Sequence, residues 1–233
     1  MNKNKFSFFK YLSIMLVSSF FLSACGKKIV TTANPTPVSQ ILELSNQDKP
    51  VISLIPSADG HELKLKIDNI SQNITEFEYD LIYSVVDESL EMEKGAGDTI
   101  KVTTKNFEKD ILMGTSSCTT GVCKYKYDQG VVGGTLSITF LTSNNQSLRY
   151  ETPFTFKTSK DIKKEGGLSL SLENFQIKGT ITSVNDYFIL IKNLSDYYSV
   201  FSSGIGKGTI TSISPETVTK EDKTTFIGNY LIN

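Results

Sequence analysis

The sequence predicts an all-β protein, an antiparallel β-sandwich followed by a smaller β-rich domain. Apolar and polar residues alternate with a period of two in many short segments, the pattern of strands that bury one face. Clusters of Gly, Asn, Asp and Ser separate these segments at short intervals, as in sandwiches of two antiparallel sheets. We expect the sandwich over residues 50–158, a linker over 159–167 and the small β-rich domain over 168–233.

The first strands are predicted over 51–55 and 62–67, and the turn residues 57–60 between them predict a hairpin. The clearest strand is 75–85, where aromatic and aliphatic residues occupy one face and acidic residues the other. Residues 87–93 are expected to form a loop, whose acidic residues lack the spacing of a calcium loop. The further strands expected in the sandwich are 99–104, 106–113, 124–127, 135–141 and 152–157.

Glu76, Glu78 and Asp80 share one face of the strand 75–85, because residues two apart in a strand point the same way. Three carboxylates in this arrangement are candidates for calcium binding or for paired acids in a hydrolase. The other interpretation is a solvated charged face, in which Lys64 and Lys66 of the preceding strand pair with these acids across the sheet.

The second half begins after residues 159–167, a charged segment that ends in two glycines and predicts a domain boundary. The sequence Lys-Gly-Thr-Ile-Thr-Ser-Val at 178–184 recurs at 207–213 with Ile in the last position. Two copies are too few for a solenoid, so they represent either two equivalent strands of one small sheet or chance similarity. The other strands expected here are 168–172, 176–184, 187–191, 197–201 and a last strand within 226–233.

The N-terminus carries three lysines, an apolar run over 11–22, and the sequence Leu22-Ser23-Ala24-Cys25. This arrangement resembles the lipobox of bacterial prolipoproteins. The resemblance implies that residues 1–24 are a signal peptide and that Cys25 becomes a lipid-modified N-terminus, which anchors the protein on the extracytoplasmic face of a bacterial cell membrane. The alternatives are an ordinary signal peptide or a spanning helix, which needs about 20 mostly apolar residues.

Residues 25–49 are rich in Thr, Asn, Pro and Ser, so we expect a flexible linker between the anchor and the sandwich. Within it, residues 41–44 predict a first edge strand or a short helix. The chain has 24 Lys and Arg against 25 Asp and Glu, and three of the lysines precede Cys25. Nucleic-acid binding depends on clustered basic residues, so a nucleic-acid partner is not expected.

Cys118 and Cys123 are the two remaining cysteines, and outside the cytoplasm we expect them to form a structural disulfide that stiffens a loop. Their spacing differs from the redox motif with two intervening residues. His61 is the only histidine, so no zinc site is expected, and the sequence predicts no cofactor.

Catalytic residues are not predicted. His61 lies in a hairpin turn, and no nucleophile-elbow motif accompanies it. The glycines at 204–208 surround a lysine but lack the spacing of a phosphate-binding loop, and a strand follows where that loop requires a helix. Carboxylates therefore remain the only candidates for a hydrolase.

Several aromatic residues lie outside clean alternation, and exposed rings can bind sugars or protein partners. The candidate binding residues are Tyr125, Tyr127, Tyr197 and Tyr198, with core or edge-strand packing as the alternative. The sandwich is similar in size to immunoglobulin-like and fibronectin type III-like domains, a resemblance of architecture alone. We expect a non-enzymatic envelope or surface protein that binds a protein or a glycan. The alternatives are a structural spacer in an envelope complex and a carboxylate-dependent hydrolase.

Overall fold

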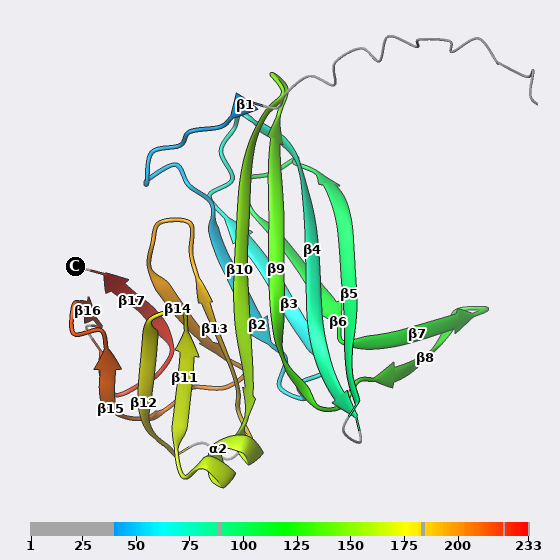
Figure 1. The fold of residues 1–233 in the computed structure, drawn as a ribbon. Coiled ribbons are helices and arrows are strands. Elements are labelled where there is room, and N and C mark those ends of the chain that lie inside the picture. Colours follow the sequence, from blue (N-terminus) through cyan, green and yellow to red (C-terminus); the bar gives the residue numbers. More distant parts are fainter. Residues whose placement is uncertain (1–39, 88–89, 183–184, 221, 233) are drawn as a thin grey trace, which may run out of the picture. The chain divides into compact units, whose positions relative to one another are not determined.

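The computed structural model describes residues 40–87, 90–182, 185–220 and 222–232 (Figure 1). The predicted signal peptide, the lipobox residues Leu22, Ser23 and Ala24, Cys25 and the linker up to residue 39 lie outside the described residues. The described part is almost entirely β, which confirms the all-β prediction. Its strands pair in antiparallel fashion except for one parallel pairing of two residues.

The largest sheet of the described part has the strand order β16-β17-β14-β13-β10-β9-β4-β5, and β1 pairs with β10 beside this path. A second sheet has the order β2-β3-β6, a third has the order β11-β12-β15, and β7 pairs with β8 alone. The strands of the large sheet are β1 (Gln40–Ile41), β4 (Ile74–Asp87), β5 (Leu90–Lys101), β9 (Val131–Thr142), β10 (Gln146–Thr158), β13 (Tyr187–Lys192), β14 (Tyr198–Ser202), β16 (Val218–Thr219) and β17 (Gly228–Ile232). The other strands are β2 (Val51–Pro56), β3 (Glu62–Asp68), β6 (Phe107–Leu112), β7 (Gly114–Thr119), β8 (Val122–Tyr127), β11 (Leu168–Leu172), β12 (Phe175–Ile181) and β15 (Gly208–Ser214).

The first hydrophobic core lies between the sheet β2-β3-β6 and one face of the large sheet, which we call its inner face (Figure 1). The alternation predicted for 75–85 is observed in β4, where Phe77, Tyr79 and Leu81 are buried in this core while Glu78 and Asp80 are exposed. The same alternation in β3 buries its leucines and exposes its lysines. Period-two patterning therefore positions the sandwich as expected.

A second core lies on the opposite face of the large sheet, under β11-β12-β15. Strand β13 contributes to both cores: Ile189 and Ile191 pack in the first, and Phe188 and Leu190 in the second. Strand β10, from the predicted sandwich, pairs with β13, from the predicted small domain, so the large sheet continues across the predicted boundary. Both cores consist of residues between Leu42 and Tyr230, so a chain that begins at residue 26 keeps every described contact.

The buried side chain of Asn193 joins β2 to the C-terminal half. Its Oδ1 accepts a hydrogen bond from the Ile52 backbone N–H at 3.0 Å, and its Nδ2 donates to the Ile52 carbonyl at 3.2 Å. Nδ2 also donates to the Ser199 hydroxyl at 3.0 Å. At Ile52, on the edge of β2, this one side chain therefore supplies the hydrogen bonds that a neighbouring strand would otherwise make.

A helix occupies most of the segment predicted as the linker 159–167. Helix α2 spans Ser159–Glu165 and begins with a capping box, in which the side chain of Thr158 accepts from the Asp161 backbone and the side chain of Asp161 accepts from the Thr158 backbone. It ends at Gly166, whose φ of 77° is the left-handed conformation that glycine adopts most easily. Thr158, Asp161 and Gly166 were signals in the sequence that predict this helix.

The two copies of the repeat form neighbouring strands of one small sheet, the first of the two interpretations. Strands β12 and β15 pair so that Thr180 lies opposite Thr209, its equivalent in the other copy. The glycines Gly179 and Gly208 both lie against one edge of the Phe226 ring, where added Cβ atoms would approach its Cζ to 2.6 Å and its Cε2 to 2.8 Å. Both would also collide with backbone oxygens of the opposite strand, so the repeated glycine makes room for one buried ring.

Three expectations about the sandwich were wrong or incomplete. Residues 90–93 belong to β5 and are not a loop. Lys64 and Lys66 do not pair with the acids of β4, because β3 lies in the other sheet and its lysines pair with the acidic residues Asp68, Glu108 and Asp110. Residues 40–49 of the expected linker pack on the folded part, since Gln40–Ile41 pair with β10 and Leu42 is buried.

Candidate functional site

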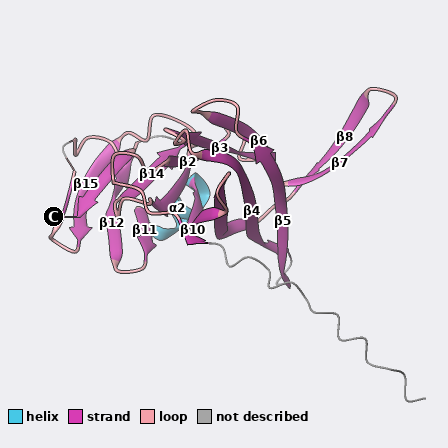
Figure 2. Ribbon diagram, turned by 90° about the horizontal axis from the view of Figure 1, so that it is seen from above, coloured by secondary structure: helices cyan, strands magenta, loops and turns pink. Residues whose placement is uncertain are grey.

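The hairpin of β7 and β8 extends away from the rest of the described residues, and we call residues 114–127 the arm (Figures 1 and 2). Its strands pair only with each other, and residues 115–127 are exposed on both faces. An isolated two-stranded hairpin is marginally stable in water. The arm therefore depends on local restraints, which the structure places at its tip and at its base.

At the tip, a disulfide joins Cys118 and Cys123, which lie opposite each other in the hairpin. The predicted disulfide is thus present, and it closes the turn of a ribbon. In the chain-entropy account, a disulfide that closes such a short loop stabilises the folded state by roughly 2 kcal/mol. The bond holds the two strands together where no core supports them.

At the base, backbone hydrogen bonds fix the arm to the sandwich. The N–H of the buried Met113 donates to the His61 carbonyl at 2.8 Å, and the N–H of Asp128 donates to the Met113 carbonyl at 3.0 Å. These bonds lie immediately before and after the arm. Its direction relative to the sandwich is therefore set by the start of β3.

The side chain of Asp128 strengthens this base. It is 6% exposed, forms an ion pair with Lys94 of β5, and accepts a hydrogen bond from the Tyr83 hydroxyl of β4 at 2.8 Å. Burial and this hydrogen bond raise the pKa of Tyr83, so its hydroxyl remains a donor. Asp128 is structural in this arrangement, and nothing in the sequence distinguished it from the other aspartates.

Three aromatic rings form a parallel series along one face of the arm. Tyr125 and Tyr127 are 54% and 37% exposed, and their rings lie 6.1 Å apart with an interplanar angle of 3°. The imidazole of His61 stacks on Tyr127 at 3.9 Å between ring centroids, with an angle of 5°. We call Tyr125, Tyr127 and His61 the aromatic face. Stacking restricts the rotation of each ring, which lowers the entropy lost when a ligand contacts them.

His61 is held by the turn between β2 and β3. Its Nδ1 lies 3.2 Å from Asp59 Oδ2, and the Ser57 hydroxyl donates to Asp59 Oδ1 at 2.7 Å. Hydrogen bonds from the Ser57 hydroxyl and from the His61 backbone lower the pKa of Asp59. Among the described hydrogen bonds, Ser57 is thus directed at the carboxylate and not at the imidazole, so these three residues do not have the serine–histidine contact of a nucleophilic triad.

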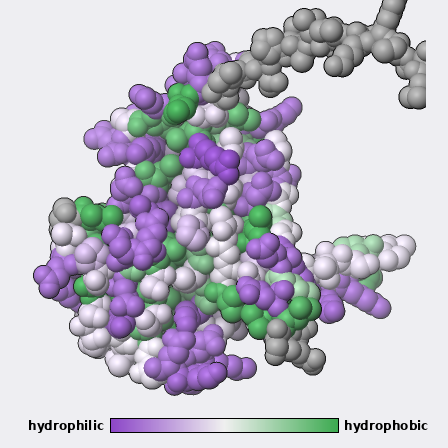
Figure 3. All heavy atoms as spheres, viewed as in Figure 1, coloured by the Kyte–Doolittle hydropathy of each residue, from purple (hydrophilic) through white to green (hydrophobic). Residues whose placement is uncertain are grey.

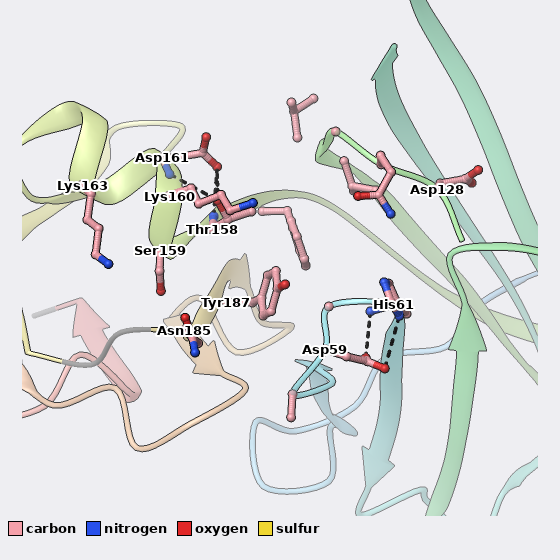
Figure 4. A pocket seen from close by; sticks show the side chains of 17 residues that line it. Asp59, His61, Asp128, Thr158, Ser159, Lys160, Asp161, Lys163, Asn185 and Tyr187 are labelled. Atoms are coloured by element: carbon pink, nitrogen blue, oxygen red, sulfur yellow. Dashed lines mark hydrogen bonds and ion pairs between the residues drawn. The ribbon is translucent and has the colours of Figure 1, made fainter. Parts of the chain in front are cut away.

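A pocket of about 660 Å³ opens beside the base of the arm (Figure 4). Asp59 and His61 lie on one side of it, and α2 with Lys160 lies on the other, while Tyr187 lies between them. Its volume is within the range of small-molecule sites. Four segments meet here, namely the β2–β3 turn, the β8–β9 connection, the start of α2 and the residues before β13. The lining combines polar side chains, such as Asp59 and Lys160, with apolar ones, such as Val131 and Phe156.

The other predicted binding residues lie elsewhere. Tyr198 is 1% exposed, and its ring stacks on Phe175 at 4.5 Å in the second core, so it presents no surface to a ligand. Tyr197 is half-buried at the start of β14. The structure thus brings Tyr125 and Tyr127 together with His61, and it separates them from Tyr197 and Tyr198. The contact of Tyr127 with His61 joins distant parts of the chain, and no motif in the sequence predicts it.

Among the described residues, no group of three or more His, Cys, Asp or Glu side chains is arranged to hold a metal ion. None of the helices within that part of the chain is both long and apolar enough to cross a membrane. Comparisons of the chain with models of protein families, with curated proteins and with solved structures found no match.

Proposed function

We propose that this chain is an exported, lipid-anchored protein of the bacterial envelope that binds a protein or glycan partner without catalysing a reaction. The anchor is proposed from Leu22-Ser23-Ala24-Cys25 and its resemblance to the lipobox. Two or three acyl chains on one cysteine would hold a soluble domain at a membrane, because each buried methylene contributes about 0.8 kcal/mol.

The aromatic face of the arm is the observation that supports binding. Tyr125 and Tyr127 expose large rings on a ribbon with no core of its own, although burying them would stabilise the fold. The disulfide and Asp128 keep this ribbon ordered in spite of its exposure. A rigid arm with exposed aromatic side chains beside a pocket of mixed polar and apolar lining is suited to recognition.

The test is a pull-down with residues 26–233 as bait, disulfide intact, against fractionated envelope proteins and cell-wall polymers. We expect a specific component to be retained, and we expect Tyr125→Ala with Tyr127→Ala to reduce its retention at least tenfold. Thr115→Ala with Ser117→Ala is the matched control on the opposite face of the same arm and should retain the component. Retention of nothing above background, or equal retention by the tyrosine variant, would contradict the proposal.

A further inference from the structure

The arm has a second face, which the proposed function does not use. Because side chains alternate along a ribbon, Val122, Lys124 and Lys126 point away from the aromatic face. Val122 is 67% exposed, and neither lysine forms an ion pair with another described residue. We call these three residues the basic face of the arm.

A complementary surface lies on the outer face of the large sheet, the face opposite the first core. Ile82 and Val86 of β4 are 47% and 42% exposed, and Val132, at the bulge of β9, is 51% exposed. On β5, Glu91 lies opposite Val86, and Glu93 lies two residues further along the same face. We call these five residues the outer patch. Figure 3 shows a hydrophobic area on the lower part of this face.

The charges of the outer patch lack partners within the described part of the chain, since neither Glu91 nor Glu93 forms an ion pair there. The sheet on the other side of the first core is different, because Lys64 pairs with Glu108 and Asp110 on its surface. Exposed aliphatic side chains beside unpaired carboxylates are typical of a surface that contacts an apolar and basic partner.

We propose that the basic face of the arm of one copy docks on the outer patch of a second copy. The two lysines are two residues apart in β8, and the two glutamates are two residues apart in β5. Residues two apart in a strand are separated by roughly 6.6 Å, so Lys126 and Lys124 can meet Glu91 and Glu93 at the same time. In this alignment Val122 reaches Gly95, which pairs with Ile82 and has no side chain of its own. Val122 then covers Ile82 at one end of the contact, next to the two ion pairs.

Within one copy, the base of the arm and the outer patch lie on opposite faces of β4 and β5. The base of the arm is held on the inner face, where Asp128 contacts Tyr83 and Lys94, while the outer patch is on the opposite face of the same strands. The contact joins two unlike surfaces, so each copy can offer an arm to one neighbour and a patch to another. Repetition of such a contact gives a closed ring or an open row of molecules.

The experiment is sedimentation velocity of residues 26–233 over a range of protein and salt concentrations. We expect dimers and longer species that dissociate as salt is raised, because exposed ion pairs are screened. Lys124→Glu with Lys126→Glu, and separately Glu91→Lys with Glu93→Lys, should each weaken association at least tenfold. A chain with all four substitutions should associate again, since its charges are again complementary.

Mixing the two charge variants gives the sharpest result. The arm of each variant is complementary in charge to the patch of the other, so the mixture should associate like the unmodified chain although neither variant does so alone. Lys164→Glu with Lys178→Glu is the matched control, because both lysines are exposed far from either surface, and it should associate like the unmodified chain. A monomer at all concentrations, unchanged association of either charge variant, or a mixture without dimers would overturn the proposal. Retention of an envelope component is measured in the separate pull-down with the tyrosine variant. The proposal of self-association and the proposal of partner binding can therefore fail independently.

Discussion

Replacement of Asn193 by alanine tests whether the two halves of the chain are one folding unit. The change removes three hydrogen bonds and leaves the N–H and the carbonyl of the buried Ile52 without partners. An unpaired buried backbone group costs about 1–3 kcal/mol, so we expect a loss of about 3–5 kcal/mol in the free energy of unfolding. With a urea m-value of about 2–3 kcal/mol/M, the midpoint should fall by about 1–2 M.

The assay is urea unfolding of residues 26–233, followed by far-UV circular dichroism and tyrosine fluorescence. Because β13 belongs to both cores, we expect one transition that both signals report together. Asn144→Ala, in an exposed turn, is the control and should change stability by less than about 0.5 kcal/mol. A loss at Asn193 no larger than this, or two separate transitions of which only one moves, would refute the shared-core reasoning.

Three further predictions concern other parts of the chain. Gly179→Ala and Gly208→Ala should each cost more than about 2 kcal/mol in urea unfolding, because a methyl group collides with the opposite backbone and with a buried ring; equal stability of either variant would contradict this packing. Cys118→Ser with Cys123→Ser should speed hydrogen exchange in the arm while it lowers the urea midpoint only slightly, and unchanged exchange there would show that the base alone orders the arm. Cys25→Ala should abolish lipid attachment in cells, and mass spectrometry that finds the variant acylated and cleaved at the same position would refute the lipobox interpretation.

The alternation of apolar and polar residues predicted most strands, because a strand that packs against one core buries every second side chain. β3 and β4 each bury every second residue, and that pattern is visible in the sequence. Strand β14 buries Tyr198, Ser199 and Val200 in succession, since it has packed neighbours on both faces. With no alternation to follow, Tyr198 was a candidate binding residue with core packing as the alternative, and the structure has the alternative.

Strand neighbours were harder to predict than strands. Sequential strands usually lie side by side, and this favoured pairing of Lys64 and Lys66 with the acids of β4. The chain instead passes from one sheet to the other between β3 and β4, so the lysines pair with β6. Residues 124–127 were predicted as a strand, and they lie in β8. Its stacking on His61 depends on tertiary structure that no local pattern contains.

The position of β13 between two cores also determines the order in which the protein can fold as it emerges from a ribosome or a membrane channel. The first core includes Ile189 and Ile191, and the part of β10 from Thr155 to Thr158 has no partner on this edge until β13 arrives. A nascent chain that ends near residue 165 therefore contains most of the sandwich but leaves Phe154 and Phe156 beside an open edge. Folding is completed only after most of the chain has emerged, so a partly synthesised chain exposes apolar surface of the first core.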